Sequence, residues 1–341
     1  MIDPKDLAHC RNVIRTGSLS FHAASKLLPA SVRDPALALY AFCRLADDEV
    51  DEGNHKARAV LELQERLDLA YAGTPKEAPE DRAFAAIIEE FDMPRALPEA
   101  LLEGLAWDAT ERRYQTLSDV RAYSARVASA VGAMMCVLMR VRDADALARA
   151  CDLGVAMQLT NIARDIGEDA RARRIYLPLE WMEEARLKPE DLFADPQASA
   201  EIKRMVRRLL AEAQRLYVRS EAGIRKLPVG ARAGIFAARY IYAGIGTAIR
   251  SNRYDSVSLR ARTSKVEKLR LVGKAAVRAG GTMVFPQSPV LYARPLEEVR
   301  FLVEAAAQRE DARQARNRTA ALLSVLAELR EEQNANGIAA E

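Results

Sequence analysis

Apolar residues recur along this chain at the spacing of an α-helix, and the strict alternation typical of strands is absent. Ala, Leu, Arg and Glu dominate, β-branched runs are missing, and Gly or Pro separates the periodic segments. The pattern predicts an all-α protein. The expected helices cover residues 7–15, 18–28, 35–51, 57–72, 80–91, 98–105, 118–139, 143–169, 199–226, 234–249, a basic segment ending near 274, and 296–333.

Three segments are apolar on almost every side, which is typical of helices buried in a core. Residues 36–46 carry a single charge, and residues 153–163 are mostly apolar. The stretch 127–139 is apolar too, but it is too short to span a bilayer. Asp34-Pro35 predicts the start of the helix that contains 36–46, because proline is favoured at the first helical position.

Four polar residues form a stripe on the helix predicted over 143–169, because they are spaced by three and four residues: Gln158, Asn161, Asp165 and Asp169. Asp165 and Asp169 place two carboxylates roughly 6 Å apart at their Cβ atoms. Like charges at that distance repel unless a cation lies between them, and carboxylate and amide oxygens suit Mg²⁺. A solvated charged face is the usual alternative for such a pair. This stripe emerges from an apolar helix, however, so it indicates a functional site.

A second acidic pair follows the apolar segment 36–46. Asp47 and Asp51 are again four residues apart, and they continue the inward line of the preceding apolar helix. A solvated helix end would account for the other acidic residues there, which are Asp48, Glu49 and Glu52. It accounts less well for Asp47 and Asp51, so we interpret them as the counterpart of the first pair.

Two buried helices that each end in paired carboxylates can face one another and hold about two or three Mg²⁺ (or Mn²⁺) ions. Such a cluster can bind a diphosphate and make it a leaving group, with Arg44 and Arg164 adding charge-assisted contacts to phosphate oxygens. An apolar cavity below the cluster would protect a cationic hydrocarbon intermediate from water. Its expected wall includes Phe21, Tyr40, Val127, Val131 and Ala156. Di-iron helical bundles are the nearest alternative, but they need Glu-x-x-His pairs, which this sequence lacks.

Composition excludes several other classes. The 51 basic and 48 acidic residues leave a net charge of +3, so we expect no nucleic-acid partner. The four cysteines are widely spaced, and we expect reduced thiols with no disulfide partner. The N-terminus lacks the apolar run of a signal peptide, which favours a cytoplasmic protein, soluble or peripheral on the cytoplasmic membrane face. Residues 107–114, including Asp108, are interpreted as mostly solvated or ion-paired surface.

These motifs resemble the squalene/phytoene synthase family over about residues 7–272. The matching pieces are Ser20-Phe21, Tyr40-Ala-Phe-Cys-Arg44 with Asp47-Asp-Glu-Val-Asp51, Tyr123 with Val127 and Val131-Gly132, residues 158–169 with Arg174-Ile-Tyr-Leu-Pro178, Ile241-Tyr242, and Asn252-Arg-Tyr-Asp255. There are two departures from the family pattern. Ser124 stands where members often carry cysteine, and Leu259 occupies one of two positions that are often basic, beside Arg260.

The resemblance implies an isoprenoid-synthase-type fold, a single-domain helical bundle around a central apolar cavity. It also implies head-to-head condensation of two molecules of geranylgeranyl diphosphate to phytoene, by way of a cyclopropyl diphosphate, in carotenoid biosynthesis. Mg²⁺ or Mn²⁺ is the implied cofactor, and no NADPH is expected.

The resemblance further implies roles for individual residues. The implied metal ligands are Asp47, Asp51, Asp165 and Asp169 with Asn161. The implied phosphate ligands are Arg44, Arg164, Arg174 and Arg260, while Gln158 and Asn161 orient a ligand or water. Three tyrosines are expected to stabilise cations or steer the diphosphate, namely Tyr40, Tyr123 and Tyr242.

Three alternatives stay open. Squalene or dehydrosqualene synthases use the shorter farnesyl diphosphate, and squalene formation needs NADPH. A single-substrate terpene cyclase would lack the second substrate's pocket. A non-catalytic, membrane-associated assembly factor would be expected to have lost aspartates, whereas all four remain here.

Two further expectations concern chain length and domain organisation. Ser25 lies one turn beyond Phe21 and Leu37 about one turn before Tyr40, so both should lie near the hydrocarbon end and leave depth for a C20 tail. We expect residues 1–275 to form the catalytic domain. Residues 276–341 would form a C-terminal extension, an apolar loop plus a helix, which either docks on a membrane or partner or packs on the body of the protein.

Overall fold

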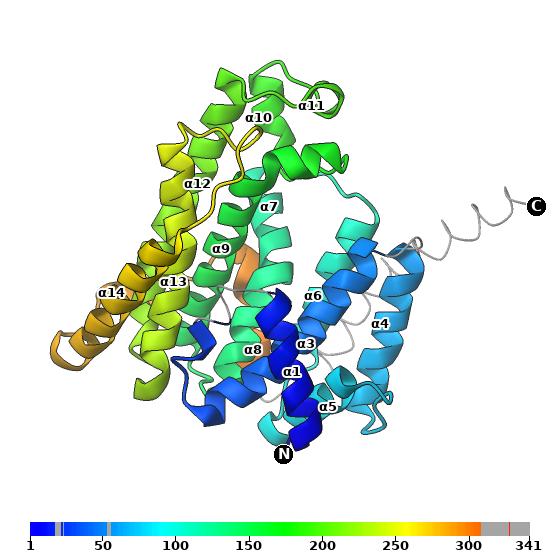
Figure 1. Cartoon of the computed structure of the whole chain (residues 1–341), viewed down its shortest axis with the longest axis vertical. Helices are drawn as coiled ribbons and strands as arrows, with labels where there is room; N and C mark the ends of the chain where they lie inside the picture. Colours follow the sequence, from blue (N-terminus) through cyan, green and yellow to red (C-terminus); the bar gives the residue numbers. More distant parts are fainter. Residues whose placement is uncertain (18–21, 23, 53–55, 308–326, 328–341) are drawn as a thin grey trace, which may run out of the picture.

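The computed structural model describes residues 1–17, 22, 24–52, 56–307 and 327, and only the backbone of residues 47 and 49–52. Within this part of the chain every regular element is a helix, which confirms the all-α prediction (Figure 1). The first half contains α1 (Pro4–Gly17), α3 (Ala30–Glu52), α4 (Lys56–Tyr71), α5 (Pro79–Phe91), α6 (Ala96–Ala109), α7 (Leu117–Ser124), η1 (Ala125–Ser129) and α8 (Ala130–Leu138). The second half contains α9 (Ala144–Arg171), α10 (Leu179–Glu184), α11 (Pro189–Ala194), α12 (Ala200–Ile224), α13 (Val229–Ser251), α14 (Lys265–Val284), η2 (Pro289–Tyr292), η3 (Glu297–Val299) and α15 (Arg300–Ala307).

Helix α9 lies at the centre of the bundle. It contacts α12, α13, α8, η1 and α15, and its apolar residues are buried along most of its length (Figure 1). The helix begins where the Asp143 carboxylate accepts a hydrogen bond from the Ala146 N–H at 2.9 Å. The predicted helix over 143–169 is therefore present, and it is surrounded by other helices as its apolar pattern required.

Helix α3 begins five residues earlier than predicted, so Pro35 lies inside it rather than at its first position. The true start follows Pro29, whose carbonyl accepts hydrogen bonds from the N–H groups of Val32 at 2.9 Å and Arg33 at 2.8 Å. A proline in the second turn of a helix lacks the N–H that would bond to the carbonyl four residues earlier, and its ring crowds that carbonyl. The prediction of the start was wrong because proline is tolerated here.

The helix predicted over 118–139 is continuous but contains a π-helical turn, η1, between α7 and α8. This turn packs closely on α9. The Ser129 hydroxyl donates to the carbonyl of Cys151 at 2.7 Å, and a Cβ added at Gly154 would lie 2.6 Å from the Ser129 Cα. Single π turns often occur at functional sites, and this one is next to the cavity described below.

The C-terminal part departs from the expected division at residue 275. Helix α14 continues to Val284, past the predicted end near 274 and across the predicted domain boundary. The following segment returns to the body: Arg149 is buried and donates to the carbonyls of Val290 at 2.7 Å and Ala293 at 2.9 Å. Helix α15 packs on α9. Of the predicted helix over 296–333, residues 297–299 form η3 and residues 300–307 form α15, and most of the remainder lies outside the described residues. The division into two domains stays a prediction.

No helix in the described ranges combines the length and the apolar composition that a bilayer span requires. The cysteines are thiols: Cys10, Cys136 and Cys151 are buried and Cys43 is half-buried. Burial raises the pKa of the Cys10 and Cys136 thiols to about 12, with Glu80 and Asp6 contributing at Cys10. These thiols therefore stay protonated at neutral pH.

Candidate active site

A cavity of about 780 Å³ lies between α3, α9, α13 and the segment from α6 to α8. Its wall is divided by polarity. Charged and amide side chains line one end, namely Arg44, Asp108, Gln158, Asn161, Arg164, Asp165, Asp169, Arg174 and Arg260. Apolar side chains make up most of the rest, including Leu28, Leu37, Val127, Val131, Met135, Leu153, Ile224, Leu227 and Ile235, and the buried Arg149 also lines the cavity. The cavity has the size and lining of a site for a ligand with a charged head and a hydrocarbon tail.

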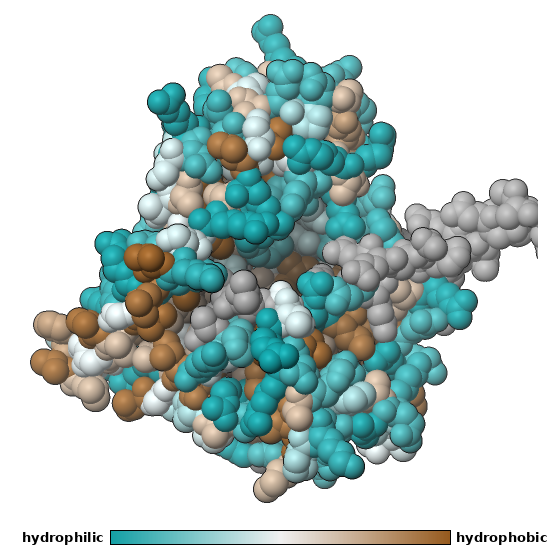
Figure 2. All heavy atoms as spheres, in the orientation of Figure 1, coloured by the Kyte–Doolittle hydropathy of each residue, from teal (hydrophilic) through white to brown (hydrophobic). Residues whose placement is uncertain are grey.

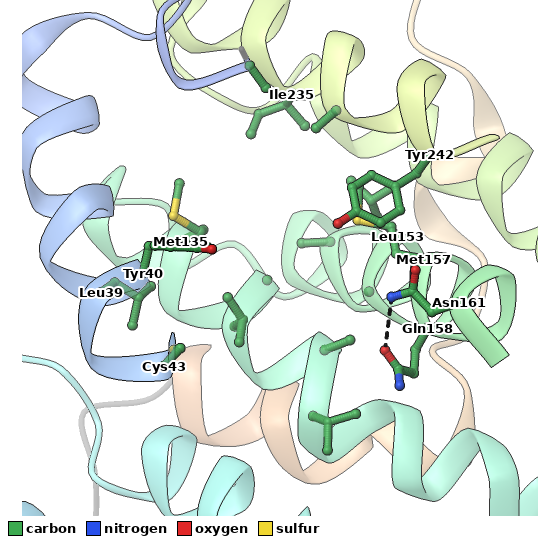
Figure 3. Close-up of a pocket in the computed structure, with 18 of the residues that line it drawn as sticks. Leu39, Tyr40, Cys43, Met135, Leu153, Met157, Gln158, Asn161, Ile235 and Tyr242 are labelled. Atoms are coloured by element: carbon green, nitrogen blue, oxygen red, sulfur yellow. Dashed lines mark hydrogen bonds between the residues drawn. The ribbon is translucent and has the colours of Figure 1, made fainter. Parts of the chain in front are cut away.

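The polar stripe of α9 faces this cavity with all four of its members. Figure 3 shows Gln158 and Asn161 beside each other, where the Asn161 amide nitrogen donates to the Gln158 side-chain oxygen at 3.4 Å. The Asn161 side-chain oxygen is buried and has no hydrogen-bond partner among the described residues. A buried acceptor without a donor is unfavourable, so this oxygen is suited to a cation or a ligand donor.

Asp165 is held by two guanidinium groups. The Arg164 Nε donates to its Oδ1 at 2.7 Å and the Arg260 Nε donates to the same oxygen at 3.0 Å. Arg260 also donates to Glu168 at 2.8 Å. Two of the predicted phosphate ligands therefore lie directly beside a predicted metal ligand, which brings fixed positive charge to the polar end of the cavity.

The position of Arg260 depends on a close contact between α9 and the loop after α13. The Gly167 N–H donates to the carbonyl of Ser256 at 3.0 Å, and a Cβ at Gly167 would lie 2.8 Å from the Cα of Val257. Asp255 stabilises the same loop, because its carboxylate accepts from the Val257 N–H at 3.1 Å. Gly167 thus permits the approach that carries Arg260 to Asp165.

Asp169 is the most perturbed carboxyl of the stripe. Burial, first, and the negative charge of Asp165 raise its pKa to about 8, and the charge of Arg174 acts in the opposite direction. Arg174 lines the cavity beside it, and its backbone N–H donates to the Asp169 carbonyl at 2.8 Å. The positive charge of Arg174 therefore offsets only part of the cost of burying a carboxylate at this position.

The second acidic pair lies on the last turns of α3, where the backbone is described but the side chains of Asp47 and Asp51 are not. Arg44 lines the cavity, and its Nε donates to Asp48 at 2.9 Å, one turn further along α3. Among the side chains that the structure does describe, no three His, Cys, Asp or Glu residues form a cluster that could hold a metal ion.

Two predicted tyrosines face each other across the cavity. In Figure 3 the side chains of Tyr40 on α3 and Tyr242 on α13 point into the pocket from opposite sides. Burial raises the pKa of Tyr242 to about 12, although the Arg164 charge opposes this. Its hydroxyl is therefore neutral at physiological pH and can serve as a hydrogen-bond donor.

The third tyrosine belongs to a cluster that the sequence analysis missed. Asp108 on α6 accepts hydrogen bonds from the hydroxyls of Tyr123 at 2.8 Å and Tyr176 at 2.7 Å. The two rings stack with centroids 5.1 Å apart, and Tyr114 packs on Tyr123 at 5.3 Å. Asp108 lines the cavity, so its interpretation as solvated surface was wrong. A carboxylate directly after an apolar helical run, the pattern that identified Asp47, also occurs at Asp108 and could have revealed it.

The residues predicted for the hydrocarbon end and two of those predicted for the apolar wall contribute to the cavity. Ser25, Leu37, Val127 and Val131 all line the cavity. Ser25 is 8% exposed, and its hydroxyl donates to the carbonyl of His22 at 3.0 Å. Leu37 is 3% exposed. Phe21 lies outside the described residues.

The helices enclose a cavity that is largely apolar and carries acidic and basic side chains in one part of its wall. This is the isoprenoid-synthase-type fold that the sequence predicted. The sequence profile described as Squalene/phytoene synthase matches residues 14–270. The chain belongs to the squalene/phytoene synthase family.

Similar proteins support this assignment. The phytoene synthase of Cereibacter sphaeroides is 60% identical over 339 residues, covering 96% of this chain and 95% of that protein. The phytoene synthase of Rhodobacter capsulatus is 61% identical over 312 residues, covering 91% and 92%. A crystal structure of a dehydrosqualene synthase has a TM-score of 0.76 at 30% identity, covering 81% of this chain and 97% of that one.

Proposed function

We propose that this chain is a prenyltransferase that condenses two molecules of geranylgeranyl diphosphate head to head to form phytoene, for carotenoid biosynthesis. The observation that carries the proposal is a cavity lined by both charged and apolar side chains, in a chain about 60% identical to phytoene synthases over most of its length. The charged end suits the diphosphates and the apolar end suits the prenyl chains.

We further propose that Asp47, Asp51, Asp165 and Asp169, with Asn161, hold Mg²⁺ or Mn²⁺. The residues present fit such ions, because the stripe supplies carboxylate and amide oxygens and leaves the Asn161 oxygen without a partner among the described residues. When bound, the metal would neutralise the diphosphate and make it a better leaving group.

The protein's own residues would bind and orient the two substrates. Arg44, Arg164, Arg174 and Arg260 would donate hydrogen bonds to phosphate oxygens, and Gln158 would orient a phosphate or a water molecule. Asp108 would hold Tyr123 in place beside the substrate. The apolar wall would exclude water from the carbocations.

The proposed reaction balances without a reductant. The C1–O bond of one substrate breaks, and its allylic carbon bonds to the C2–C3 double bond of the other substrate with loss of a proton, giving a cyclopropyl diphosphate. Loss of the second diphosphate, rearrangement and loss of a second proton give phytoene. Two diphosphates and two protons are released, which is why no NADPH is expected.

Product analysis tests the proposal. The protein is incubated with geranylgeranyl or farnesyl diphosphate, each with and without NADPH, in Mg²⁺ or in EDTA. We expect phytoene, a C40 product, from geranylgeranyl diphosphate in Mg²⁺ without NADPH. A product only from farnesyl diphosphate, or one that requires NADPH, would instead support a squalene or dehydrosqualene synthase, and turnover in EDTA would contradict the metal proposal.

We also propose peripheral association with the cytoplasmic face of a membrane. The support is chemical: the proposed substrates are amphiphilic and the proposed product is a hydrocarbon, so both would partition into a bilayer.

A further inference from the structure

The outward side of α14 is apolar along the whole helix. Large apolar side chains there are mostly exposed: Val266 (81%), Leu269 (74%), Val277 (76%), Met283 (63%), Val284 (81%), and Phe285 (66%) just after the helix. We call these six residues the α14 outer face. Figure 2 shows hydrophobic residues gathered over this helix at the lower left of the molecule.

The arrangement is the reverse of that in an ordinary surface helix. Val266, Leu269, Gly273, Val277, Gly280 and Val284 follow one another at steps of three and four, so they form one row. No charged residue belongs to this row. The opposite side of α14, with Leu271 and Ala275 buried, packs on α13. A helix that is apolar on both sides has a second surface to cover.

Basic residues flank the α14 outer face. The helix contains Lys265, Lys268, Arg270, Lys274 and Arg278 against one acidic residue, Glu267, a balance of five minus one, or +4. Three of them, Arg270, Lys274 and Arg278, line a second pocket of about 500 Å³ between α12, α13 and α14. The buried Arg239 lines the same pocket, whose acidic residues are Glu221 and Glu267.

The helix is also well placed with respect to the cavity. α14 packs on α13, and another side of α13 contributes Ile235 and Tyr242 to the cavity wall. The C-terminal end of α14 is hydrogen-bonded to α13 and to the segment between α12 and α13. There Arg232 donates to the Thr282 hydroxyl at 3.0 Å and Arg225 donates to the Phe285 carbonyl, close in sequence to the cavity residues Ile224 and Leu227.

We infer that the α14 outer face docks on an anionic phospholipid surface, with the helix lying in the plane of the headgroups. Exposed Val, Leu, Met and Phe side chains would enter the acyl boundary, and the flanking Lys and Arg would meet the phosphates. A twofold contact between two copies fits less well, because it would bring the same basic flanks together. The inference rests on the membrane association proposed above and assigns its docking surface to α14, whereas residues 289–293 and α15 pack on the body.

Co-sedimentation of the full chain with vesicles tests the inference. Vesicles of phosphatidylcholine alone are compared with vesicles that contain phosphatidylglycerol as well. The test variant is Leu269→Glu with Val277→Glu. The matched control is Val218→Glu with Val229→Glu, which changes two valines that are 57% and 59% exposed on α12 and α13. We expect binding to the anionic vesicles, a loss of about tenfold in partitioning for the test variant, and none for the control.

Each other outcome would overturn the inference. Equal binding by the test variant and the wild type would show that the face is not used, and equal binding to both vesicle types would remove the role of charge. A wild-type dimer in light scattering that the test variant converts to a monomer would make the face a contact between copies.

Condensation activity in detergent, measured on the same three proteins, separates this inference from the proposed function. It should be equal in all three, because neither substituted pair lines the cavity. Active proteins that do not bind vesicles would contradict only the membrane inference.

Discussion

Helices α9 and α14 both depart from the usual pattern of a surface helix, in opposite directions. α9 carries amide and carboxyl groups into the interior, whereas α14 presents valine, leucine and methionine to solvent. Each departure costs folding free energy, since buried charge and exposed apolar area are both unfavourable. The comparison teaches that buried charged residues and exposed apolar residues indicate a ligand. We expect a charged ligand at α9 and an apolar surface at α14.

The largest expected effect comes from removing charge from the α9 stripe. Asp165→Ala should lower kcat/KM by roughly a hundred- to a thousandfold, or about 3–4 kcal/mol, because one electrostatic contact to the transition state is lost. Asp47→Ala should have a comparable effect. Steady-state kinetics with geranylgeranyl diphosphate measure both.

Asp145→Ala, at the start of the same helix and away from the cavity, is the control and should retain near-normal activity. Near-normal turnover by folded Asp165→Ala and Asp47→Ala would contradict the role of the two acidic pairs.

Replacing a glycine by alanine should lower activity on α9 and leave activity unchanged on α14. Gly167→Ala would push the loop at Val257 away from α9 and displace Arg260, so kcat/KM should fall by roughly 10- to 100-fold. Gly273→Ala on α14 meets no atom within 4 Å. It should therefore leave activity unchanged and stabilise the helix by about 0.5–1 kcal/mol.

Kinetics and urea unfolding of both glycine variants provide the measurement. If Gly167→Ala keeps full activity while remaining folded, the close contact does not position Arg260 for function.

Substitutions at the apolar end of the cavity should change the choice of substrate, whereas substitutions in the α9 stripe should lower the overall rate. Ser25→Phe or Leu37→Trp would fill depth needed for a C20 tail, and overpacking typically costs about 1–3 kcal/mol. We expect lower use of geranylgeranyl diphosphate with farnesyl diphosphate use spared. Competition between the two substrates, scored by C40 and C30 products, measures the ratio, and an unchanged ratio in both variants would place the end of the cavity elsewhere.

The smallest expected effect is on stability and concerns Asp169, whose pKa is raised to about 8 by burial first and then by Asp165. The unfolded carboxyl has a pKa of about 3.9, so the folded state retains a proton that the unfolded state releases between these values. This carboxyl therefore lowers the stability of the metal-free protein as the pH rises from about 4 towards 8.

Asp169→Asn removes that penalty. In EDTA its Tm should exceed that of the wild type by about 2 °C or more at pH 8 and by less at pH 5. Calorimetry at both pH values checks this, with Mg²⁺ expected to raise the Tm of the wild type more than that of the variant. A Tm difference that does not change with pH would contradict the assigned burial effect.

Local sequence pattern was enough to predict the long helices and the polar stripe that forms one side of the site. The all-α class, the buried α9 and α3 and the stripe from Gln158 to Asp169 follow from periodicity within single helices. This works because residues three and four apart share a helix face whatever surrounds the helix. The family could also be recognised from the sequence, because its motifs are local. The profile match over residues 14–270 confirms it.

Only the tertiary structure decided which helices meet. Arg260 reaches Asp165 across 95 positions of sequence, and Asp108 holds Tyr123 and Tyr176 from a helix interpreted as surface. The outward direction of the apolar side of α14 depends on which side packs on α13, and its periodicity would equally suit a core helix. Contacts between distant segments depend on close approaches such as that at Gly167, and a single sequence does not specify the partner in such a contact.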